Sequence, residues 1–283
     1  NIILDCLNSI DKDIKVLIVE NSETFDHKDK ILSEFNNVEI LCTGKNLGYG
    51  GGNNFGIKTV KTDYILILNP DVICGEDFFK NLSNVIEENK NFTIIGCQYL
   101  QDKVFMPAGF FDNKENEEFT KCFKNDEIND LAKVDWVTGC SMLLNLNKFD
   151  NKKIFDENFF LYFEEFDLCK SLKRKGGEVY SSKKLKIHHL GFKSSFEENS
   201  NHRKGINRLR EWHWMWSSFY FYKKNFSYLY ALRKISGKLL KSALKIILYS
   251  LLLNQEEKEK YKYRFLGILN SILNRPSSFR DNI

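Results

Sequence analysis

The first hundred residues alternate apolar runs with helical patterns, and this alternation limits the possible folds more than any other feature of the chain. The predicted strands are 15–20, 38–43, 64–69 and 92–100, and the predicted helices are 27–35, 53–60 and 76–89. Strands that are apolar on both faces and joined by helices are typical of a mostly parallel sheet covered on both sides. The sequence therefore predicts an α/β fold of the nucleotide-binding type.

The rest of the chain predicts the end of this domain and a helical extension. We expect a polar excursion over the surface at 101–133 and a strand at 134–145. A helix at 164–175 and two further strands, near 179 and at 185–188, should complete the domain. Beyond residue 201 the pattern is helical to the end. We therefore predict one domain over 1–200 and a helical extension over 201–283.

Composition places the chain among soluble globular proteins. Hydrophobic residues make up 42% and charged residues 28%, unlike a disordered or membrane-spanning protein. The seven cysteines are scattered singly without a Cys-x-x-Cys pair, so we interpret them as reduced, mostly buried thiols of a cytosolic protein. No signal peptide is visible, and because the chain begins at Asn1 inside a helical pattern, we expect that a preceding segment is missing.

The strongest chemical signal is Asn69-Pro70-Asp71, which follows an apolar strand. Ligands of open α/β sheets bind at the carboxyl ends of the strands. The Asp71 carboxylate, helped by the Asn69 amide oxygen, suits Mg²⁺ or Mn²⁺, and a bound diphosphate supplies further oxygens. The alternative is that this segment is simply a good turn.

A segment rich in glycine and asparagine, 46–56, lies between a predicted strand and a predicted helix. Its candidate ligand-binding residues are Asn46, Gly48, Gly50 and Asn53. Glycines let backbone amides approach an anion, and a helix N-terminus favours negative charge. The segment lacks the spacing of the dinucleotide fingerprint and the Lys-Ser/Thr end of a Walker A motif. A purely structural glycine loop is the alternative.

Three carboxylates, Glu164, Glu165 and Asp167, crowd the start of the predicted helix 164–175 after an aromatic run. Each is favoured there by the helix dipole. An apolar wall raises the pKa of a carboxylate towards neutrality, as a general base requires. The alternative is an acidic first turn that only caps the helix, but the aromatic run favours a functional site.

His188 ends the last predicted core strand, with Lys193 and Ser194 close to it in the sequence. This placement makes His188 a candidate metal or phosphate contact. A pair such as His188-His189 is more often structural or exposed than metal-binding.

Taken in this order, the four elements resemble glycosyltransferase family 2, especially its bacterial rhamnosyltransferase-like branch, over residues 1 to about 195. The resemblance implies a GT-A fold. Segment 19–22, with Glu20 and Asn21, resembles the nucleotide-binding turn of the family, which usually has Asp at the position of Glu20. Segment 46–56 matches the family's asparagine- and glycine-rich segment.

The resemblance also implies roles for the later motifs. Asn69-Pro70-Asp71 corresponds to the family's Asp-x-Asp variant, with Asp71 as the metal carboxylate. Glu164-Glu165 corresponds to the Glu-Asp pair that supplies the catalytic base, and His188 to a further metal or diphosphate ligand. Glu165 departs from the family's Asp, and the family's opening strand, with its nucleotide contact, is absent.

The implied activity is inverting transfer of rhamnose or another hexose from a UDP- or dTDP-sugar to a lipid-linked or polysaccharide acceptor, in bacterial surface glycan synthesis. Glu165 would remove the acceptor proton while Glu164 and Asp167 shape its field, and Mg²⁺ or Mn²⁺ would stabilise the leaving diphosphate. The alternative is a non-catalytic binding or assembly subunit, which the missing strand and Glu165 favour.

The C-terminal third is strongly basic, with 21 basic and 7 acidic residues from Lys183 onward. One helical stripe consists of Lys234, Lys238, Lys241 and Lys245, with leucines around it, and the tryptophans before it are Trp212, Trp214 and Trp216. Basic amphipathic helices and clustered aromatics are typical of membrane interfaces. We predict a cytoplasmic protein peripheral to the anionic inner face of the cell membrane. A helical hairpin packed on the core or on a second subunit of a homo-oligomer is the alternative, and no nucleic-acid-binding module is recognised.

Overall fold

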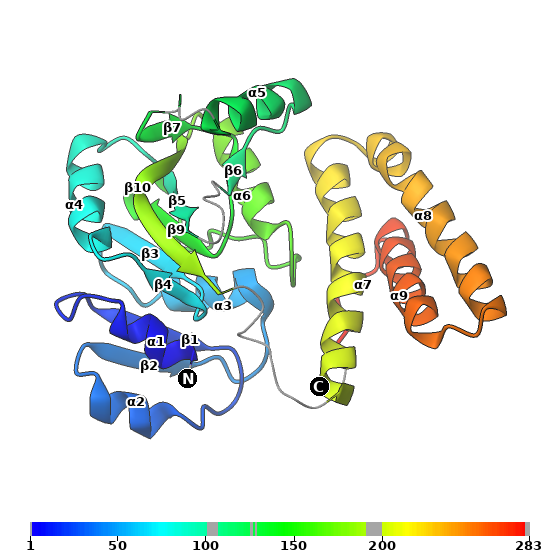
Figure 1. Cartoon of the computed structure of the whole chain (residues 1–283), viewed down its shortest axis with the longest axis horizontal. Coiled ribbons are helices and arrows are strands. Elements are labelled where there is room, and N and C mark those ends of the chain that lie inside the picture. The colour runs from blue at the N-terminus through cyan, green and yellow to red at the C-terminus, as the bar shows by residue number, and fades with distance from the viewer. Residues whose placement is uncertain (1, 101–106, 125–126, 128, 191–199, 281–283) are drawn as a thin grey trace. The chain divides into compact units, whose positions relative to one another are not determined.

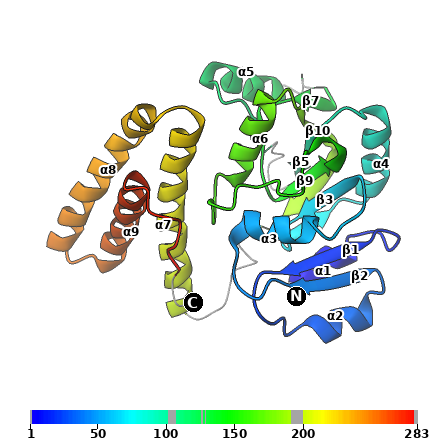
Figure 2. The ribbon, with the colours of Figure 1, turned by 180° about the vertical axis from the view of Figure 1, so that it is seen from behind.

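The structure, a computed structural model, describes residues 2–100, 107–124, 127, 129–190 and 200–280, so Lys193 and Ser194 lie outside the described residues. The chain forms two compact units (Figures 1 and 2). The sheet unit comprises Asn1–Asn46, Gly52–Phe155 and Leu168–Ser194, and the helical unit comprises Leu47–Gly51, Asp156–Asp167 and Ser195–Ile283. The helical unit therefore includes two short segments that carry predicted site residues.

A six-stranded sheet organises the sheet unit. Five strands follow the order β3-β9-β5-β10-β4, and β7 pairs with β10. Their bounds are β3 (Tyr64–Leu68), β4 (Val72–Cys74), β5 (Ile94–Tyr99), β7 (Leu131–Lys133), β9 (Ser141–Asn145) and β10 (Val179–His189). Two smaller sheets are the parallel pair β1 (Val16–Glu20) and β2 (Val38–Cys42) and the antiparallel pair β6 (Ala108–Gly109) and β8 (Trp136–Val137).

The predicted α/β class with flanking helices is confirmed, while the strand directions differ in part from the mostly parallel expectation. β10 runs parallel to β5, and β9 runs antiparallel to both β3 and β5, so β3, β5 and β10 share one direction. β4 and β7 run antiparallel to β10. An apolar strand reveals that both of its faces are buried, but its composition does not encode its direction.

The helices of the first 190 residues match the predicted order with local differences. They are α1 (Ile2–Asn8), α2 (Lys28–Glu34), α3 (Gly48–Ile57), α4 (Phe78–Glu88), α5 (Asn113–Lys124), the 3₁₀ turn η1 (Leu146–Lys148) and α6 (Glu164–Arg174). α5 lies inside the predicted irregular excursion. β10 is one continuous strand with a register shift between Ser182 and Lys186, where two strands were expected.

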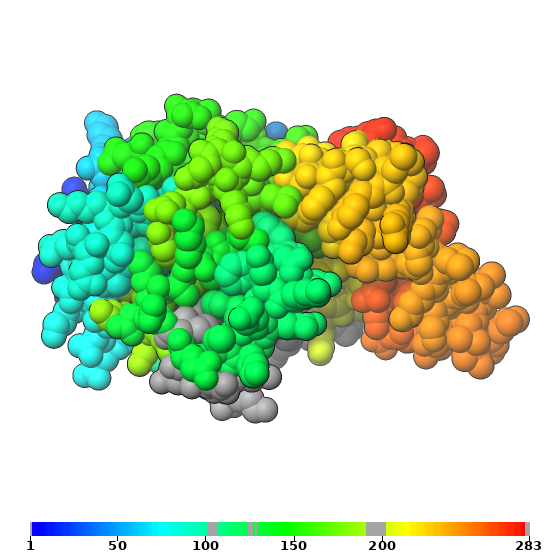
Figure 3. All heavy atoms as spheres, turned by 90° about the horizontal axis from the view of Figure 1, so that it is seen from above, coloured from blue at the N-terminus to red at the C-terminus, as the bar shows by residue number. Residues whose placement is uncertain are grey.

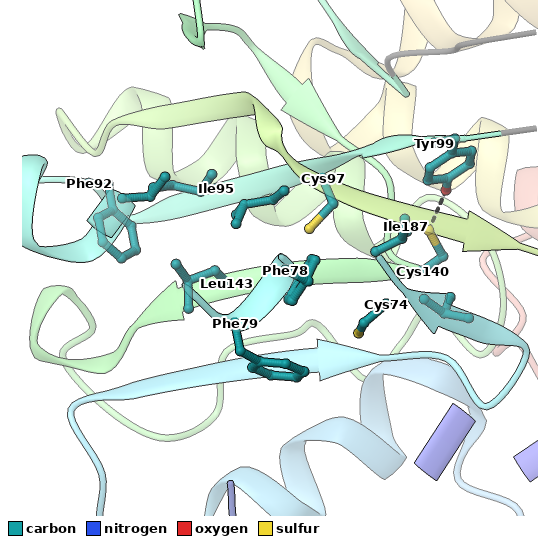
Figure 4. Packing of buried hydrophobic residues seen from close by; sticks show 13 residues of the cluster. Cys74, Phe78, Phe79, Phe92, Ile95, Cys97, Tyr99, Cys140, Leu143 and Ile187 are labelled. Atoms are coloured by element: carbon teal, nitrogen blue, oxygen red, sulfur yellow. Dashed lines mark hydrogen bonds between the residues drawn. The ribbon is translucent and has the colours of Figure 1, made fainter. Parts of the chain in front are cut away.

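The core of the sheet unit packs between α4 and the central strands (Figure 4). Phe78 and Val85 lie two helical turns apart on α4, so both side chains face the sheet. Burial of each such side chain contributes about 1.5–3 kcal/mol. Cys74, Cys97 and Cys140 belong to the same cluster, and five of the seven free cysteines are buried. The interpretation of the cysteines as mostly buried thiols is therefore confirmed.

Three long helices form the body of the helical unit, α7 (Ser200–Asn225), α8 (Tyr228–Leu251) and α9 (Gln255–Ile272), and each packs on the other two. Their shared core includes Phe219, Ile235 and Ile268, all fully buried. A Cβ atom on Gly267 would overlap the carbonyl oxygen of Trp212, so this glycine permits the close approach of α9 to α7. None of the described helices combines the length and the apolar character that crossing a membrane requires.

The three neighbouring tryptophans of α7 differ in exposure. Trp212 and Trp216 are 4% and 3% exposed, whereas Trp214 is 43% exposed. The Trp212 ring stacks on Phe279 with ring centroids 5.6 Å apart, and Trp216 Nε1 donates to the Arg275 carbonyl at 3.0 Å. The interpretation of this cluster as interfacial aromatics is therefore wrong for Trp212 and Trp216, because both belong to the interior of the helical unit.

Candidate functional site

Asp71 lies in the turn between β3 and β4, as the sequence predicts. The Asn69 N–H donates to the Cys140 carbonyl at 2.9 Å, and the Val72 N–H donates back to the Asn69 carbonyl at 3.2 Å, which closes the turn. The Leu190 N–H donates to the Asp71 carbonyl at 2.9 Å. Asp71 is only 2% exposed. Backbone hydrogen bonds on both sides therefore fix this aspartate beside the end of β10.

The imidazole next to Asp71 belongs to His189 and not to His188. Nε2 of His189 lies 3.4 Å from Oδ1 of Asp71, and its ring lies 5.4 Å from that of Tyr99. His188 is exposed, and its Cα pairs with Ile73 on β4. Successive side chains of a strand point to opposite faces of the sheet. Only one of the two histidines can thus face Asp71, and it is His189, whereas the sequence pattern pointed to His188.

The pair Asp71 and His189 fits a divalent cation. Carboxylate oxygens suit Mg²⁺ and Mn²⁺, and imidazole nitrogens suit transition-metal ions, so the combined donor set is compatible with a divalent cation such as Mn²⁺. Burial and the Asp71 charge raise the pKa of the nearby Cys6 thiol to about 11, so without a bound cation this thiol is protonated at neutral pH. Among the described residues no cluster of three or more His, Cys, Asp or Glu could hold a metal.

The predicted nucleotide contacts Glu20, Asn21 and Asn46 meet at the carboxyl ends of β1 and β2. Nδ2 of Asn21 donates to Oδ1 of Asn46 at 3.2 Å, and the Thr43 hydroxyl donates to Oδ1 of Asn21 at 3.3 Å. The Thr43 N–H donates to the Glu20 carbonyl at 3.0 Å. A Cβ on Gly52 would lie 3.4 Å from the Asn21 amide group, so the two residues are in contact. These polar groups lie where open α/β sheets bind ligands.

Residues 48–56 of the glycine-rich segment form nearly all of helix α3 and not a loop, which corrects the sequence-based expectation. Gly48 begins the helix with φ +77°, and Gly50 is buried inside it, while Asn53 is half-buried. The Tyr49 N–H donates to the Phe160 carbonyl at 3.1 Å. Glycine is a poor helix former, so the pattern predicted a loop. Close packing of the backbone, which only glycine permits, overrides that propensity.

Gly48→Ala is expected to destabilise the protein more than Gly44→Ala. Both glycines have left-handed backbone, with φ +77° and +76°, which costs an L-residue about 1–2 kcal/mol. A Cβ at Gly48 would also overlap the carbonyl of Phe160, whereas Gly44 has nothing within 4 Å of that position. Urea unfolding should show Gly48→Ala less stable than Gly44→Ala by a further ~1–3 kcal/mol. Equal losses would contradict the contact with Phe160.

Asn54 is a structural residue of α3 that the sequence analysis missed. It is fully buried. Its Oδ1 accepts from the N–H groups of Ile154 and Phe155 at 3.0 and 2.9 Å, and its Nδ2 donates to the Phe155 carbonyl at 2.9 Å. This side chain therefore fixes the chain directly before the acidic segment. No sequence pattern marks an asparagine inside a helix for such a role.

The acidic segment 156–167 enters helix α6 through two strained residues. Tyr162 and Phe163 have φ +69° and +71°, which is unfavourable for bulky side chains. Such conformations cost about 1–3 kcal/mol each, persist only where their surroundings hold them, and cluster at functional sites. Glu164 and Glu165 follow immediately as the first residues of α6. The strain thus lies where the sequence places the catalytic base.

The two glutamates differ in burial, and both have raised pKa values. Glu164 is 4% exposed, and burial together with the Glu165 charge raises its pKa well above the usual range. Oε2 of Glu164 has no hydrogen-bond partner among the described residues. Burial raises the pKa of Glu165 to about 7. Of the two, Glu165 has the pKa that suits a general base at neutral pH.

Asp167 has a different environment from the two glutamates. Its Oδ2 lies 2.6 Å from Nζ of Lys224, and its Oδ1 accepts from Nδ2 of Asn225 at 2.7 Å. Both oxygens are therefore occupied by residues at the end of α7, which the sequence analysis did not connect to the site. Asp71 belongs to the sheet unit and Glu165 to the helical unit.

Sequence comparisons identify relatives of this chain. Residues 1–150 match the family described as Glycosyl transferase family 2. Rhamnosyltransferase WbbL of Escherichia coli (strain K12) is 24% identical over 256 residues, covering 83% of this chain and 89% of that protein. N-acetylglucosaminyl-diphospho-decaprenol L-rhamnosyltransferase of Mycobacterium tuberculosis is 23% identical, covering 63% and 67%. The Haloferax volcanii hexosyltransferase Agl10 is 26% identical, and the match spans 56% of this chain and 53% of Agl10.

A solved structure shows the same fold. The mannosyltransferase PcManGT of Pyrobaculum calidifontis, in complex with GDP-Man and Mn²⁺, superposes with a TM-score of 0.53 at 11% identity, over 96% of this chain and 82% of that one. Similarity at this identity shows the fold alone, and it confirms the predicted GT-A architecture. With this fold, and with a family match that spans more than half of its length, the chain is a transferase that belongs to glycosyltransferase family 2.

Proposed function

We propose that the protein is an inverting glycosyltransferase that moves a hexose from a nucleoside diphosphate sugar to a hydroxyl group of a lipid-linked or polysaccharide acceptor. The observation that carries the proposal is Glu165, a carboxylate with a pKa of about 7 at a strained helix start, in a chain of glycosyltransferase family 2. Rhamnose is the favoured sugar, because two of the relatives are named rhamnosyltransferases.

In this mechanism Glu165 removes the proton from the acceptor hydroxyl. The oxygen attacks the anomeric carbon from the face opposite the leaving diphosphate, and this single displacement inverts the configuration. Burial and the Glu165 charge raise the pKa of Glu164, which disfavours a second negative charge beside the Glu165 carboxylate. Asp167 is neutralised by Lys224 and serves to hold the helix start.

Asp71 and His189 are the residues that would hold a divalent cation in the sheet unit. When bound, such an ion supplies positive charge to the departing diphosphate. Its use by this chain is supported by the carboxylate–imidazole pair and by the Mn²⁺ of the structural neighbour. We infer from the geometry that His189, rather than the predicted His188, is the second protein ligand. Glu20, Asn21 and Asn46, together with Gly48, Gly50, Asn53 and Asn69, remain the candidates for donor binding.

A donor screen tests the function directly. Purified protein is incubated with dTDP-rhamnose, UDP-hexoses or GDP-mannose and Mn²⁺, with and without a polyprenyl-diphosphate sugar acceptor, and released nucleotide is measured. A product with an inverted anomeric centre, identified by NMR, supports the proposal. A non-catalytic subunit, the alternative class, would release no nucleotide and show no metal-dependent donor binding by calorimetry.

We also propose that α8 attaches the protein to an anionic membrane. Leu240, Leu244, Ile247 and Leu251 are 57–78% exposed along one face of α8, opposite its buried Ala231 and Ile235. In the space-filling view α8 forms part of the outer surface of the helical unit (Figure 3). An open groove of about 310 Å³ combines leucines of this face with Lys241 and Lys245. Exposed apolar side chains beside lysines match the chemistry of an anionic phospholipid surface.

The double substitution Leu244→Glu/Leu251→Glu is expected to weaken binding to vesicles of phosphatidylglycerol and phosphatidylcholine at least tenfold, because it places two charges in the apolar interface. Co-sedimentation measures this. Leu32→Glu, on the exposed surface of α2 at 40% exposure, is the matched control and should bind like the wild type. Unchanged vesicle binding of the double variant, or a change of a dimer into a monomer instead, would reject the membrane assignment.

A further inference from the structure

One face of α7 lines the acidic segment 156–167 inside the helical unit. The residues of this face are Trp214, Ser217, Tyr220, Phe221, Lys224 and Asn225. Their spacings of three and four residues keep them on the same side of the helix. Both candidate catalytic glutamates therefore lie on a segment whose support comes from the C-terminal helices.

Contacts from α7 hold the middle of the segment, where the backbone is strained.

 The Ser217 hydroxyl donates to the Leu161 carbonyl at 2.8 Å. The Tyr162 ring centroid lies 5.2 Å from that of Trp214, and the Phe163 ring centroid lies 5.3 Å from it. Both residues with positive φ are thus packed against the same tryptophan. Contacts of this kind are what keeps an unfavourable backbone conformation in place.

Lys224 joins the two ends of the segment. Its Nζ lies 2.7 Å from Oδ2 of Asp156 and 2.6 Å from Oδ2 of Asp167. The Tyr220 hydroxyl donates to the same oxygen of Asp156 at 3.1 Å, and Asn225 Nδ2 donates to Oδ1 of Asp167 at 2.7 Å. The Asp167 side chain is 4% exposed and that of Lys224 is 31% exposed. A single cation therefore bridges the entry of the segment and the first turn of α6.

The bridge is charged on both sides. Burial opposes ionisation of Asp156, but hydrogen bonds from Lys224 and Asn158 outweigh it and lower the Asp156 pKa. Burial likewise disfavours the Lys224 cation, and its hydrogen bonds to Asp156 and Asp167 outweigh that effect and raise its pKa. Charge-assisted hydrogen bonds of this length are about twice as strong as neutral ones. Loss of the lysine would leave two carboxylates without their shared cation.

We propose that Lys224 is a positioning residue for the Glu165 base, an inference that rests on the proposed function. The Asp167 N–H donates to the Phe163 carbonyl at 2.9 Å, which is the first hydrogen bond of α6. The Lys224 ammonium group holds the Asp167 side chain after the strained turn and the Asp156 side chain before it. Glu165 lies two residues before Asp167 on that helical turn, so the bridge sets the direction in which its carboxylate points.

Lys224→Met tests the inference, with Lys223→Met as the matched control. Both variants lose one lysine charge at the end of α7, but Lys223 donates to Asn274 and touches neither aspartate. Lys224→Met is expected to lower kcat about 10- to 100-fold, as misplacement of a catalytic group does, with the KM of the donor unchanged. Hydrogen–deuterium exchange of peptides spanning 156–167 should rise in this variant alone. Lys224→Arg, which can bridge both carboxylates, should restore most of kcat.

The exchange measurement separates this inference from the proposed function, because it needs no turnover. A wild type that transfers no sugar would reject the proposed function, whereas a Lys224→Met variant that matches Lys223→Met in exchange or in kcat would overturn the inference. An equal loss in Lys224→Arg would also overturn it. If Lys224→Met does not fold, Asp156→Asn, which removes one arm of the bridge and keeps the buried pair with Asp167, is measured against the same expectations at smaller magnitude.

Discussion

Glu165→Gln is expected to lower kcat about 10²- to 10⁴-fold, the usual contribution of a general base. The amide keeps the size and hydrogen-bonding shape of the side chain but cannot accept the proton of the acceptor hydroxyl. Because the change affects the base and not the donor contacts, metal-dependent donor binding measured by calorimetry should be unchanged. Initial-rate measurements with donor and acceptor both saturating give kcat.

Glu164→Gln is the matched control for this variant. Burial and the Glu165 charge raise the pKa of Glu164, which favours its protonated form, and a neutral amide imitates that form. We expect kcat within a few-fold of the wild type. The reverse ranking, with Glu164→Gln inactive and Glu165→Gln active, would assign the base to Glu164.

The pH dependence of the wild type should follow Glu165. A general base must be unprotonated to act, and burial raises the Glu165 pKa to about 7. kcat/KM should therefore fall as the pH decreases through about 7 and reach a plateau above it, because this profile reports the free enzyme. The profile of Glu165→Gln should lack this limb. A wild-type profile that stays flat from pH 8 to pH 5 would exclude a base with this pKa.

The parts of the fold that follow from local pattern were predictable from the sequence. The apolar run 64–69 forms β3, and Asn-Pro-Asp at its end forms the turn at Asp71. Both follow from neighbouring residues, because a run of apolar side chains predicts a buried strand and Asn, Pro and Asp favour a turn. The start of α6 at Glu164 was predicted for the same reason. Strand order and direction depend on partners far along the chain. The position of β9 between β3 and β5 could therefore not be predicted from the sequence.

The details of the candidate site depended on non-local contacts. Whether His188 or His189 faces Asp71 is decided by the phase of β10 against β4, and two adjacent histidines carry no signal of that phase. Bulky aromatics argue against positive φ, so nothing in the sequence indicated the turn at Tyr162. Lys224 lies 57 residues from Asp167, and a basic residue in the last turn of a helix is already explained by the helix dipole.

Asp71→Asn is expected to reduce kcat/KM about a thousandfold or more. The substitution keeps the turn, because the hydrogen bonds that close it are made by the backbone of Asn69, Val72 and Leu190. It removes the buried negative charge that would hold a divalent cation, and with it the stabilisation of the departing diphosphate. Calorimetry should show that Mn²⁺ no longer strengthens donor binding, while the circular dichroism spectrum matches the wild type.

Substitution of each of the two histidines tests which of them lies beside Asp71. His189→Ala removes the imidazole that lies 3.4 Å from the Asp71 carboxylate, so the apparent Mn²⁺ affinity should fall about 10- to 100-fold. His188→Ala removes an exposed side chain on the other face of the same strand. This variant should keep the Mn²⁺ affinity of the wild type. If His188→Ala were the variant that lost Mn²⁺ affinity, β10 would have to shift by one residue against β4. That shift would expose its buried Leu185 and Ile187, so the packing of the core itself favours His189.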